Sequence, residues 1–249
     1  ACGIIGTYIA GFSGYKLGRL FTAATKKSQA KLAWDEMAKF INVDTDLKYD
    51  KGKNPDGYFD VKEYNTTIKA MNTGCTIVAL SREGGLDDGF RAIFASVDEI
   101  HQHRDNAIYK AIYNGTRSLP ETLVSMITTR GKKLNSFCRE METYAINALK
   151  GLVLAEDFFV DIYCLDDGDD IWDERNWIKA NPFICAPGNE ELFKVLQTDA
   201  QTARDMGGSD LRDFLTKSLN MWVENTDDNF INSEKWKACG SDRTLEAFR

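Results

Sequence analysis

Two adjacent carboxylates, Asp98 and Glu99, follow an almost uninterrupted apolar run at 91–97 and precede His101. Such a run is typical of a strand that is buried on both faces of a parallel sheet, and ligands of open α/β sheets bind beyond the carboxyl ends of strands. Asp98 is expected to hold Mg²⁺ through water, because Mg²⁺ prefers hard oxygen ligands and keeps several waters. Glu99 is expected to orient the water that attacks a γ-phosphate, or to accept its proton.

An acidic pair at a strand end also has a plain structural interpretation, because it can cap the next helix or face solvent. Two hydroxyls favour the chemical one. Thr128 and Thr129 follow the next apolar run, 122–127, and would lie beside Asp98 if the two strands are neighbours. They could then hydrogen-bond the attacking water or the γ-phosphate and pass its presence to the rest of the domain. The alternative for these hydroxyls is a β-branched strand end before an ordinary turn. Together the two motifs favour an ATPase with a Walker B motif.

The phosphate-binding loop of such an ATPase is missing from these residues. No G-x-x-x-x-G-K-[ST] sequence occurs in the chain, and the glycines at 11–18 have neither its spacing nor a preceding strand. The chain also starts within an apolar pattern, without an initiator Met. It is therefore expected to be a fragment.

Alternating helical and strand patterns position these candidates. Apolar or period-two runs predict strands, and apolar residues three and four apart predict helices. The predicted strands are 20–24, 75–80, 91–97, 122–127 and 158–163, and the polar segment 43–74 is expected to form a loop or an irregular hairpin. The predicted helices are 3–12, one capped by Ser28 and reaching Ile41, 105–113 closed by Asn114-Gly115, 135–152, 190–204 and 209–222. This alternation predicts a mostly parallel sheet with crossover helices.

Composition limits the classes of partner. A net charge of −7 argues against nonspecific nucleic-acid binding by the whole surface, although it permits a local basic patch. No apolar run approaches the length of about 20 residues that spans a bilayer. The six cysteines are scattered without a C-x-x-C pair, so neither a zinc site nor a disulfide framework is expected.

Five segments, in the same order along the chain, resemble the large terminase subunits of HK97-like phages. They are TAATKKSQA at 22–30, VDEIH at 97–101, ITTRG at 127–131, WIKANP at 177–182 and the stretch from Phe214-Leu215 to Asn220-Met221-Trp222. The resemblance implies a P-loop NTPase fold of the RecA/ASCE type, with an ATPase core at 1–155 and a small α-rich lid or linker subdomain at 156–249. It also implies that the Walker A loop lies just before Ala1, and a nuclease domain just beyond residue 249.

The resemblance implies a motor that hydrolyses ATP with Mg²⁺ to move double-stranded viral DNA into a procapsid, while the nuclease domain cuts concatemers. Glu99 would activate water, Asp98 would organise Mg²⁺, and Thr128 and Thr129 would couple hydrolysis to movement. The implied partners are the small terminase subunit, the portal protein of the procapsid and further copies in a ring, with no membrane. The implied location is the bacterial host cytoplasm, with transient docking on the procapsid.

Three weaker candidates keep two interpretations each. Arg82 would serve as an arginine finger for a neighbouring subunit, or lie in a surface turn. The basic cluster Arg130, Lys132 and Lys133 would contact DNA phosphates or form a solvated helix entry. The acidic run at 166–174 is interpreted as a solvated loop before a helix start rather than a metal site.

Two other functions compete with the packaging motor. A helicase-type translocase also carries an acidic pair followed by His. A catalytically inactive structural fragment is the second alternative, since the Walker A loop is absent from the chain.

Overall fold

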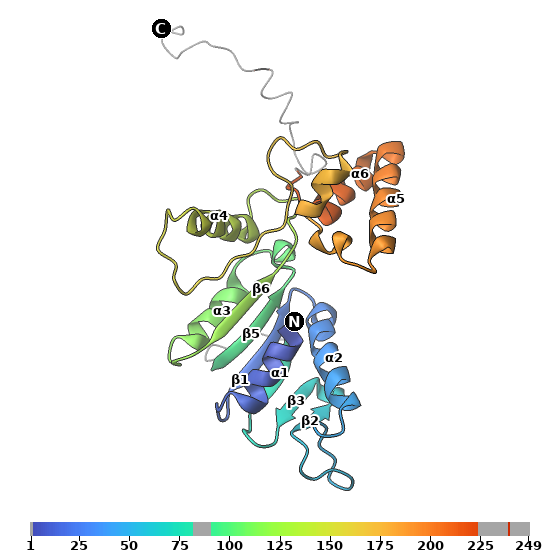
Figure 1. The fold of residues 1–249 in the computed structure, drawn as a ribbon. Helices are drawn as coiled ribbons and strands as arrows, with labels where there is room; N and C mark the ends of the chain where they lie inside the picture. The colour runs from blue at the N-terminus through green and yellow to red at the C-terminus, as the bar shows by residue number, and fades with distance from the viewer. Residues whose placement is uncertain (1, 82–90, 224–238, 240–249) are drawn as a thin grey trace, which may run out of the picture. The chain divides into compact units, whose positions relative to one another are not determined.

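The computed structural model describes residues 2–81, 91–223 and 239, and Figure 1 shows the course of the chain. Contacts within the chain divide it into two compact units. The first comprises Ala1–Thr129 and Ser136–Ala155, and the second comprises Arg130–Asn135 and Glu156–Arg249. The segment Arg130–Asn135 thus belongs to the second unit, although the residues before and after it belong to the first.

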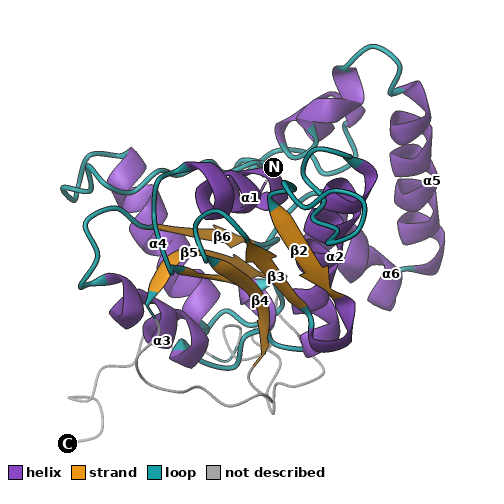
Figure 2. Ribbon diagram, turned by 90° about the horizontal axis from the view of Figure 1, so that it is seen from below, coloured by secondary structure: helices purple, strands orange, loops and turns teal. Residues whose placement is uncertain are grey.

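The first unit is built on a six-stranded sheet with the order β2-β3-β4-β1-β5-β6, whose strands are the orange arrows of Figure 2. Its strands are β1 Arg19–Ala24, β2 Phe59–Lys62, β3 Thr67–Ala70, β4 Thr76–Ser81, β5 Ala92–Asp98 and β6 Leu123–Ile127. Strands β4, β1, β5 and β6 are parallel, and β2 and β3 form an antiparallel hairpin that continues onto β4. The prediction of a mostly parallel sheet is confirmed.

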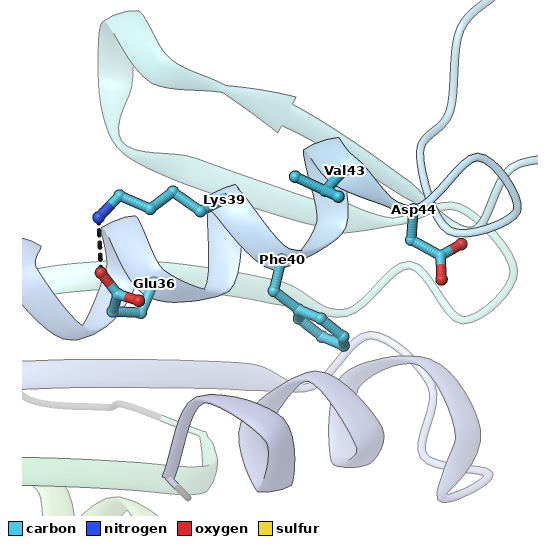
Figure 3. A pocket seen from close by; sticks show the side chains of 5 residues that line it. All are labelled: Glu36, Lys39, Phe40, Val43 and Asp44. Carbon is cyan, nitrogen blue, oxygen red and sulfur yellow. Dashed lines mark hydrogen bonds and ion pairs between the residues drawn. The ribbon is translucent and has the colours of Figure 1, made fainter.

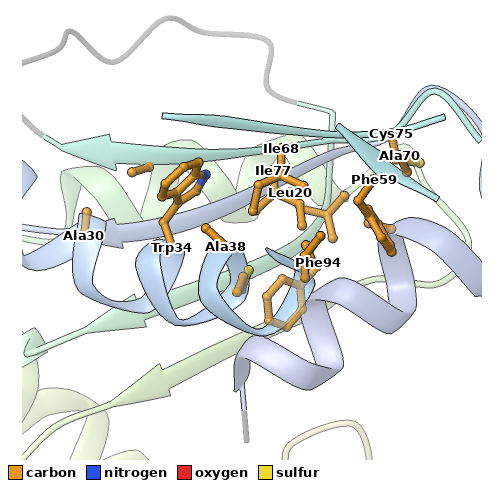
Figure 4. Close-up of a cluster of buried hydrophobic side chains, with 14 of the residues drawn as sticks. Leu20, Ala30, Trp34, Ala38, Phe59, Ile68, Ala70, Cys75, Ile77 and Phe94 are labelled. Carbon is orange, nitrogen blue, oxygen red and sulfur yellow. The ribbon is translucent and has the colours of Figure 1, made fainter. Parts of the chain in front are cut away.

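Helices α1 (Cys2–Phe12) and α2 (Lys27–Val43) contact each other and the central strands. Trp34 and Met37 on α2 and Phe94 on β5 are fully buried in one hydrophobic cluster, in which Figure 4 labels Trp34 and Phe94. Helix α1 approaches the hairpin very closely at Gly11, where a Cβ atom would lie 2.6 Å from Cζ of Phe59. Glycine is therefore required there, because any side chain would displace that ring.

Helix α3 (Ala107–Thr116) packs on β5, and α4 (Phe137–Leu149) contacts the 3₁₀ turn Ile100–Gln102. Two predicted helix ends in this unit are wrong. Helix α2 begins at Lys27 with Lys26 as its N-cap, so Ser28 lies inside the helix and does not cap it. The predicted stop at Asn114-Gly115 also lies within a helix, because α3 continues to Thr116.

The second unit is helical in its described part. It contains α5 (Glu190–Met206), α6 (Gly208–Asp213), the 3₁₀ helices Glu174–Lys179 and Pro182–Cys185 and a π-helical turn, Phe214–Ser218. Its core gathers Trp177, Leu196, Phe214 and Leu219, all buried. No helix in the described part of either unit is long and apolar enough to cross a membrane.

Two predictions in the second unit are wrong. Residues 158–163 form no strand: their alternation of exposed and half-buried side chains fits an extended chain, but no described strand pairs with them. The predicted helix 209–222 stops at Asp213, passes into the π-helical turn and ends before Leu219. Backbone hydrogen-bond partners, which a single-strand pattern does not specify, decide both outcomes.

Candidate active site at the carboxyl end of the sheet

Strands β5 and β6 bring the predicted carboxylates and hydroxyls together. The two strands are parallel neighbours, with Asp98 opposite Ile127 in the register. All residues of β5 before Asp98 are buried, and Asp98 is the first that is partly exposed. Glu99 and Thr128 therefore each follow their strand by one residue at the same edge of the sheet, as the sequence predicts.

Glu99 adopts a left-handed backbone conformation, with φ at 53° and ψ at 46°. For a residue with a Cβ atom this conformation costs roughly 1 kcal/mol or more, and such strain concentrates at functional sites. The turn is held on both sides. The amide of Glu99 donates to Oδ1 of Asp98 at 2.9 Å, and the buried Ile100 begins the following 3₁₀ turn. The strained backbone thus fixes where the Glu99 carboxylate begins.

His101 lies between the Glu99 carboxylate and the Thr128 hydroxyl. Its Nδ1 is 3.0 Å from Oε2 of Glu99 and 2.9 Å from Oγ1 of Thr128. Its backbone amide also donates to the Thr128 hydroxyl, at 3.1 Å. That hydroxyl donates its one hydrogen to the carbonyl of Thr129, at 2.7 Å. Nδ1 of His101 must therefore carry a hydrogen, because the Thr128 oxygen can only accept from it.

The charge state of His101 follows from its surroundings. Burial lowers the pKa of His101 below its ordinary value, and the negative charges of Glu99 and Asp98 oppose that shift. The side chain is 20% exposed, and the net direction favours the neutral ring. A neutral ring with its hydrogen on Nδ1 contacts Glu99 without neutralising it.

Oε2 of Glu99 is buried and has no hydrogen-bond partner among the described residues. The nearby Nδ1 of the neutral His101 ring lies 3.0 Å away, but it is not aligned as a hydrogen-bond donor to this oxygen. Buried polar atoms in folded proteins are normally satisfied, so an unpartnered carboxylate oxygen indicates a ligand or an ordered water. This oxygen is available to accept a hydrogen from a bound molecule.

The residue after β1 and the first turn of α2 supply two further atoms of this kind. Oγ1 of Thr25 and Oε1 of Gln29 are also buried without hydrogen-bond partners in the described part of the chain. Strand β1 is paired with β5, with Ala23 opposite Val97, so Thr25 and Glu99 both lie two residues beyond a paired position. Nε2 of Gln29 donates to Oε1 of Gln102 at 3.1 Å, which links the start of α2 to the turn after Glu99.

Sequence reasoning assigned no role to Thr25, Gln29 or Gln102. The signal was available for the first two, because Thr25 and Gln29 follow a buried strand, β1, that ends at the same edge as β5. The carboxyl ends of neighbouring parallel strands meet at one edge, so their next residues are candidates for the same site.

The remaining predicted residues stand as follows. Thr129 follows Thr128 and offers its carbonyl to it, and the coupling role of its side chain stays a prediction. Arg82 lies outside the described residues. Arg130 and Lys132 are engaged within the second unit, where the Arg130 amide donates to Asn220 at 2.7 Å and Lys132 forms an ion pair with Asp213 at 2.8 Å. Their predicted DNA contact stays untested.

The acidic run and the WIKANP segment form a structural lock in the second unit. Nζ of Lys179 bonds the carboxylates of Asp166 and Asp169, both at 2.8 Å, and its hydrogen bond lowers the pKa of Asp169. The indole of the buried Trp177 donates to the carbonyl of Ile171 at 2.9 Å. Two carboxylates of this run are thus engaged by Lys179, and the interpretation of the run as a solvated loop rather than a metal site stays a prediction.

A shallow hollow on α2 does not belong to the site (Figure 3). It is lined by the last turns of the helix and by a Lys39–Glu36 ion pair of 2.6 Å; its residues are Glu36, Lys39, Phe40, Val43 and Asp44. Helix α2 starts just after the carboxyl end of β1 and runs for 17 residues, about 25 Å, away from that edge. The hollow therefore lies far from Glu99.

Solved structures share this fold. The crystal structure of the HK97 bacteriophage large terminase matches 96% of this chain and 47% of its own, with a TM-score of 0.71 and 19% identity. An R139A mutant of the large terminase ATPase domain of Thermus phage P74-26 matches 89% of this chain and 82% of its own, with a TM-score of 0.52 and 11% identity. At these identities the matches establish the fold.

Sequence comparison identifies the family. Protein YmfN of Escherichia coli (strain K12) is 31% identical over 187 residues, which are 72% of this chain and 40% of YmfN, so the chain spans less than half of that relative. The family model for the terminase large subunit ATPase domain matches residues 12–147, more than half of the chain. The model for the terminase large subunit endonuclease domain matches residues 153–245. The chain therefore belongs to the terminase large subunit family.

Proposed function

We propose that Asp98, Glu99 and Thr128 form the hydrolytic part of an ATPase site in the intact terminase. The observation that carries this proposal is the buried, unpartnered Oε2 of Glu99 at the carboxyl end of β5, beside the Thr128 hydroxyl that follows β6. Hydrolysis needs an acceptor for the proton of the attacking water, held in a fixed place. Oε2 of Glu99 is the acceptor, and the left-handed backbone of Glu99 and the nearby His101 ring fix its place.

The residues at this edge fit a magnesium ion. Asp98 and Glu99 present carboxylate oxygens, the ligands that Mg²⁺ prefers, and Asp98 is held in place by the amide of Glu99. When bound, Mg²⁺ would neutralise charge on the phosphates of ATP. Asp98 would hold the ion through its water shell, and Glu99 would remain free to take the proton.

His101 would orient Glu99 without protonating it. Its neutral ring keeps one hydrogen on Nδ1 for the Thr128 hydroxyl, and the same nitrogen lies 3.0 Å from Oε2 of Glu99. A change in the position of the Glu99 carboxylate would therefore change the hydrogen bonds of Thr128. This contact supports the predicted coupling role of Thr128, and Thr129 would take part through the carbonyl that accepts from Thr128.

In the intact protein this site would drive translocation of double-stranded viral DNA into a procapsid, and the nuclease would cut concatemers. Family membership supports this function over a helicase-type translocase. The partners would be the small terminase subunit, the portal protein and further copies in a ring, in the cytoplasm of a bacterial host. Arg82 would act as an arginine finger towards a neighbouring copy. Because the chain contains no Walker A sequence, the 249 residues alone would not turn over ATP.

We propose that residues 156–249 form a lid or linker subdomain. The endonuclease family model matches 153–245, whereas the resemblance implied a nuclease domain beyond residue 249. The described part of the second unit, up to residue 223, contains helices and no strand. These helices support the proposed linker, which would occupy the first part of the segment that the endonuclease model matches.

The substitution Glu99→Gln in a full-length terminase that carries this segment tests the proposed function. We expect it to keep ATP binding and to lose ATP turnover by about 10²-fold or more, because the amide accepts no proton. Glu121→Gln is the matched control, since Glu121 is exposed and uses only backbone atoms to bond Tyr15. Turnover of Glu99→Gln close to that of the control would refute the assignment.

A further inference from the structure

The segment that follows Thr128 is anchored in the second unit by one asparagine, Asn220. Thr128 belongs to the first unit, where it is bonded to His101, and two residues later Arg130 belongs to the second unit. Two residues of extended chain span at most about 7 Å. Any displacement of the end of β6 must therefore be absorbed by Thr129 or passed to Arg130.

Asn220 holds Arg130 through both its side chain and its backbone. Oδ1 of Asn220 accepts from the amide of Arg130 at 2.7 Å, and the carbonyl of Asn220 accepts from Nη1 of Arg130 at 3.1 Å. The other half of the amide, Nδ2, donates to the carbonyl of Tyr163 at 2.7 Å. One side chain thus joins the segment after β6 to a second, distant part of the same unit.

The backbone at this position restricts which residues can do this. Asn220 has φ at 49°, in the left-handed region that glycine and asparagine adopt most readily. Glycine would allow the conformation but provide no amide. Aspartate would provide the acceptor for Arg130 but no donor for Tyr163. Asparagine alone of these three satisfies the backbone and both hydrogen bonds.

Asn220 is fixed in turn on the core of the second unit. The preceding residue, Leu219, is fully buried, and its amide donates to the carbonyl of Phe214 at 3.1 Å across the π-helical turn. The next amide, that of Met221, donates to the carbonyl of Leu215 at 2.8 Å. The Lys132–Asp213 ion pair ties the same two segments together a second time.

We infer that Asn220 is a positioning residue that couples ATP hydrolysis to DNA movement by clamping Arg130, so that a shift at Thr128 moves the second unit. This inference rests on the proposed ATPase function. It gives a role to the Phe214–Trp222 segment, which the resemblance singled out without explaining. Loss of the clamp would leave hydrolysis intact. The chain between Thr128 and Arg130 would then absorb the displacement of Thr128, and the second unit would not move.

The test measures ATP turnover and DNA length moved per ATP in a full-length terminase that carries this segment. Asn220→Gly keeps the backbone conformation, and we expect its ATP turnover to stay near wild type. The length of DNA moved per ATP should fall about tenfold, because the variant loses one or two hydrogen bonds that hold Arg130. Hydrogen exchange at the amide of Arg130 should accelerate. Asn176→Gly is the control, because it removes a similar bond, to Asp170, elsewhere in the unit.

Asn220→Asp is the second variant, and it keeps the acceptor for the Arg130 amide. Its length moved per ATP should stay near wild type, and a fall as large as that of Asn220→Gly would overturn the clamp. Equal loss of turnover and movement in a folded Asn220→Gly protein would show a structural role and overturn the inference. If Asn220→Gly moved as much DNA per ATP as wild type, and Glu99→Gln separately abolished turnover, the inference would fall while the proposed function would stand. Turnover that survives Glu99→Gln would remove the proposed function first.

Discussion

The ring of His101 and the hydroxyl of Thr128 meet at 2.9 Å, although 27 residues separate them in the chain. The contact exists because β5 and β6 are parallel neighbours whose ends lie at one edge of the sheet. The same ring nitrogen lies 3.0 Å from the Glu99 carboxylate. The proposed proton acceptor and the proposed coupling residue are therefore both in contact with one imidazole.

Removal of the Thr128 hydroxyl should uncouple this contact. Thr128→Val keeps the shape of the side chain but leaves two donors of His101 without an acceptor, so we expect ATP turnover to fall by about tenfold. Thr128→Ser retains the hydroxyl and should stay close to wild type. Steady-state ATP hydrolysis by the full-length protein decides between them, and equal activity of the two variants would contradict a role for the hydroxyl.

Replacement of His101 should separate its hydrogen-bonding role from any role of its charge. An asparagine amide can place a donor near the position of Nδ1, so His101→Asn should keep much of the turnover, whereas His101→Ala should lose it. The reason is that the neutral ring acts as a donor to Thr128. Steady-state turnover, compared at one pH and saturating ATP, is the measurement. Full activity of His101→Ala would show that Glu99 needs no orientation.

The Lys179 lock should stabilise the second unit in a pH-dependent way. The hydrogen bond from Lys179 lowers the pKa of Asp169 below its ordinary value of 3.8, so this pair contributes stability above that pH and loses it as the pH falls through the lowered pKa. Lys179→Met should therefore lower the thermal midpoint at pH 7 and have a smaller effect near pH 3.

Thermal unfolding followed by circular dichroism at both pH values measures this difference. Lys194→Met is a suitable control, because Lys194 is 66% exposed and, within the described part of the chain, its ion pair is with Glu191, three residues before it in α5. If the thermal midpoint of Lys179→Met fell by the same amount at pH 3 as at pH 7, the lost stability would come from packing of the Lys179 side chain and not from its charge interaction with Asp169.

The loop before the β2–β3 hairpin offers a matched pair of glycines. A Cβ atom on Gly57 would lie 2.2 Å from the backbone carbonyl oxygen of Lys48, whereas on Gly52 its nearest neighbour would be Oδ1 of Asp50 at 3.6 Å. Gly57→Ala must displace the backbone and should lower the free energy of unfolding by about 2 kcal/mol. Gly52→Ala should change it little. Urea unfolding of the two variants measures the difference, and similar midpoints would contradict the close approach.

The sequence predicted the four parallel strands and the edge that carries the candidate site, because local patterns specify both. Apolar runs marked β1, β4, β5 and β6, and the carboxyl-end rule placed Asp98 and Glu99 beside Thr128. Long-range pairing was not visible in the same way. The contact of Gln29 with Gln102 and that of Arg130 with Asn220 join residues 73 and 90 positions apart. No periodicity of either segment specifies its partner.

Local patterns also failed where a partner decides the structure. Residues 158–163 alternate as a strand would, and Phe159 is 89% exposed, yet no described strand lies beside them. Serine is a residue type that often caps helices, but α2 begins at Lys27, one residue before Ser28. Neighbours in space, rather than residue type, determined these outcomes.

The assignment of Arg130–Asn135 to the second unit has a practical consequence for dissecting the protein. The polypeptide passes between the two units at 129/130, 135/136 and 155/156, so neither unit is a single continuous stretch. A truncation at residue 155, which the sequence pattern suggests, would delete Asn220 and Asp213, the partners of Arg130 and Lys132. Such a piece would carry a loop that has lost its bonds to Asn220 and Asp213. Two-part complementation, with both halves supplied together, is therefore better suited than isolated expression of the first.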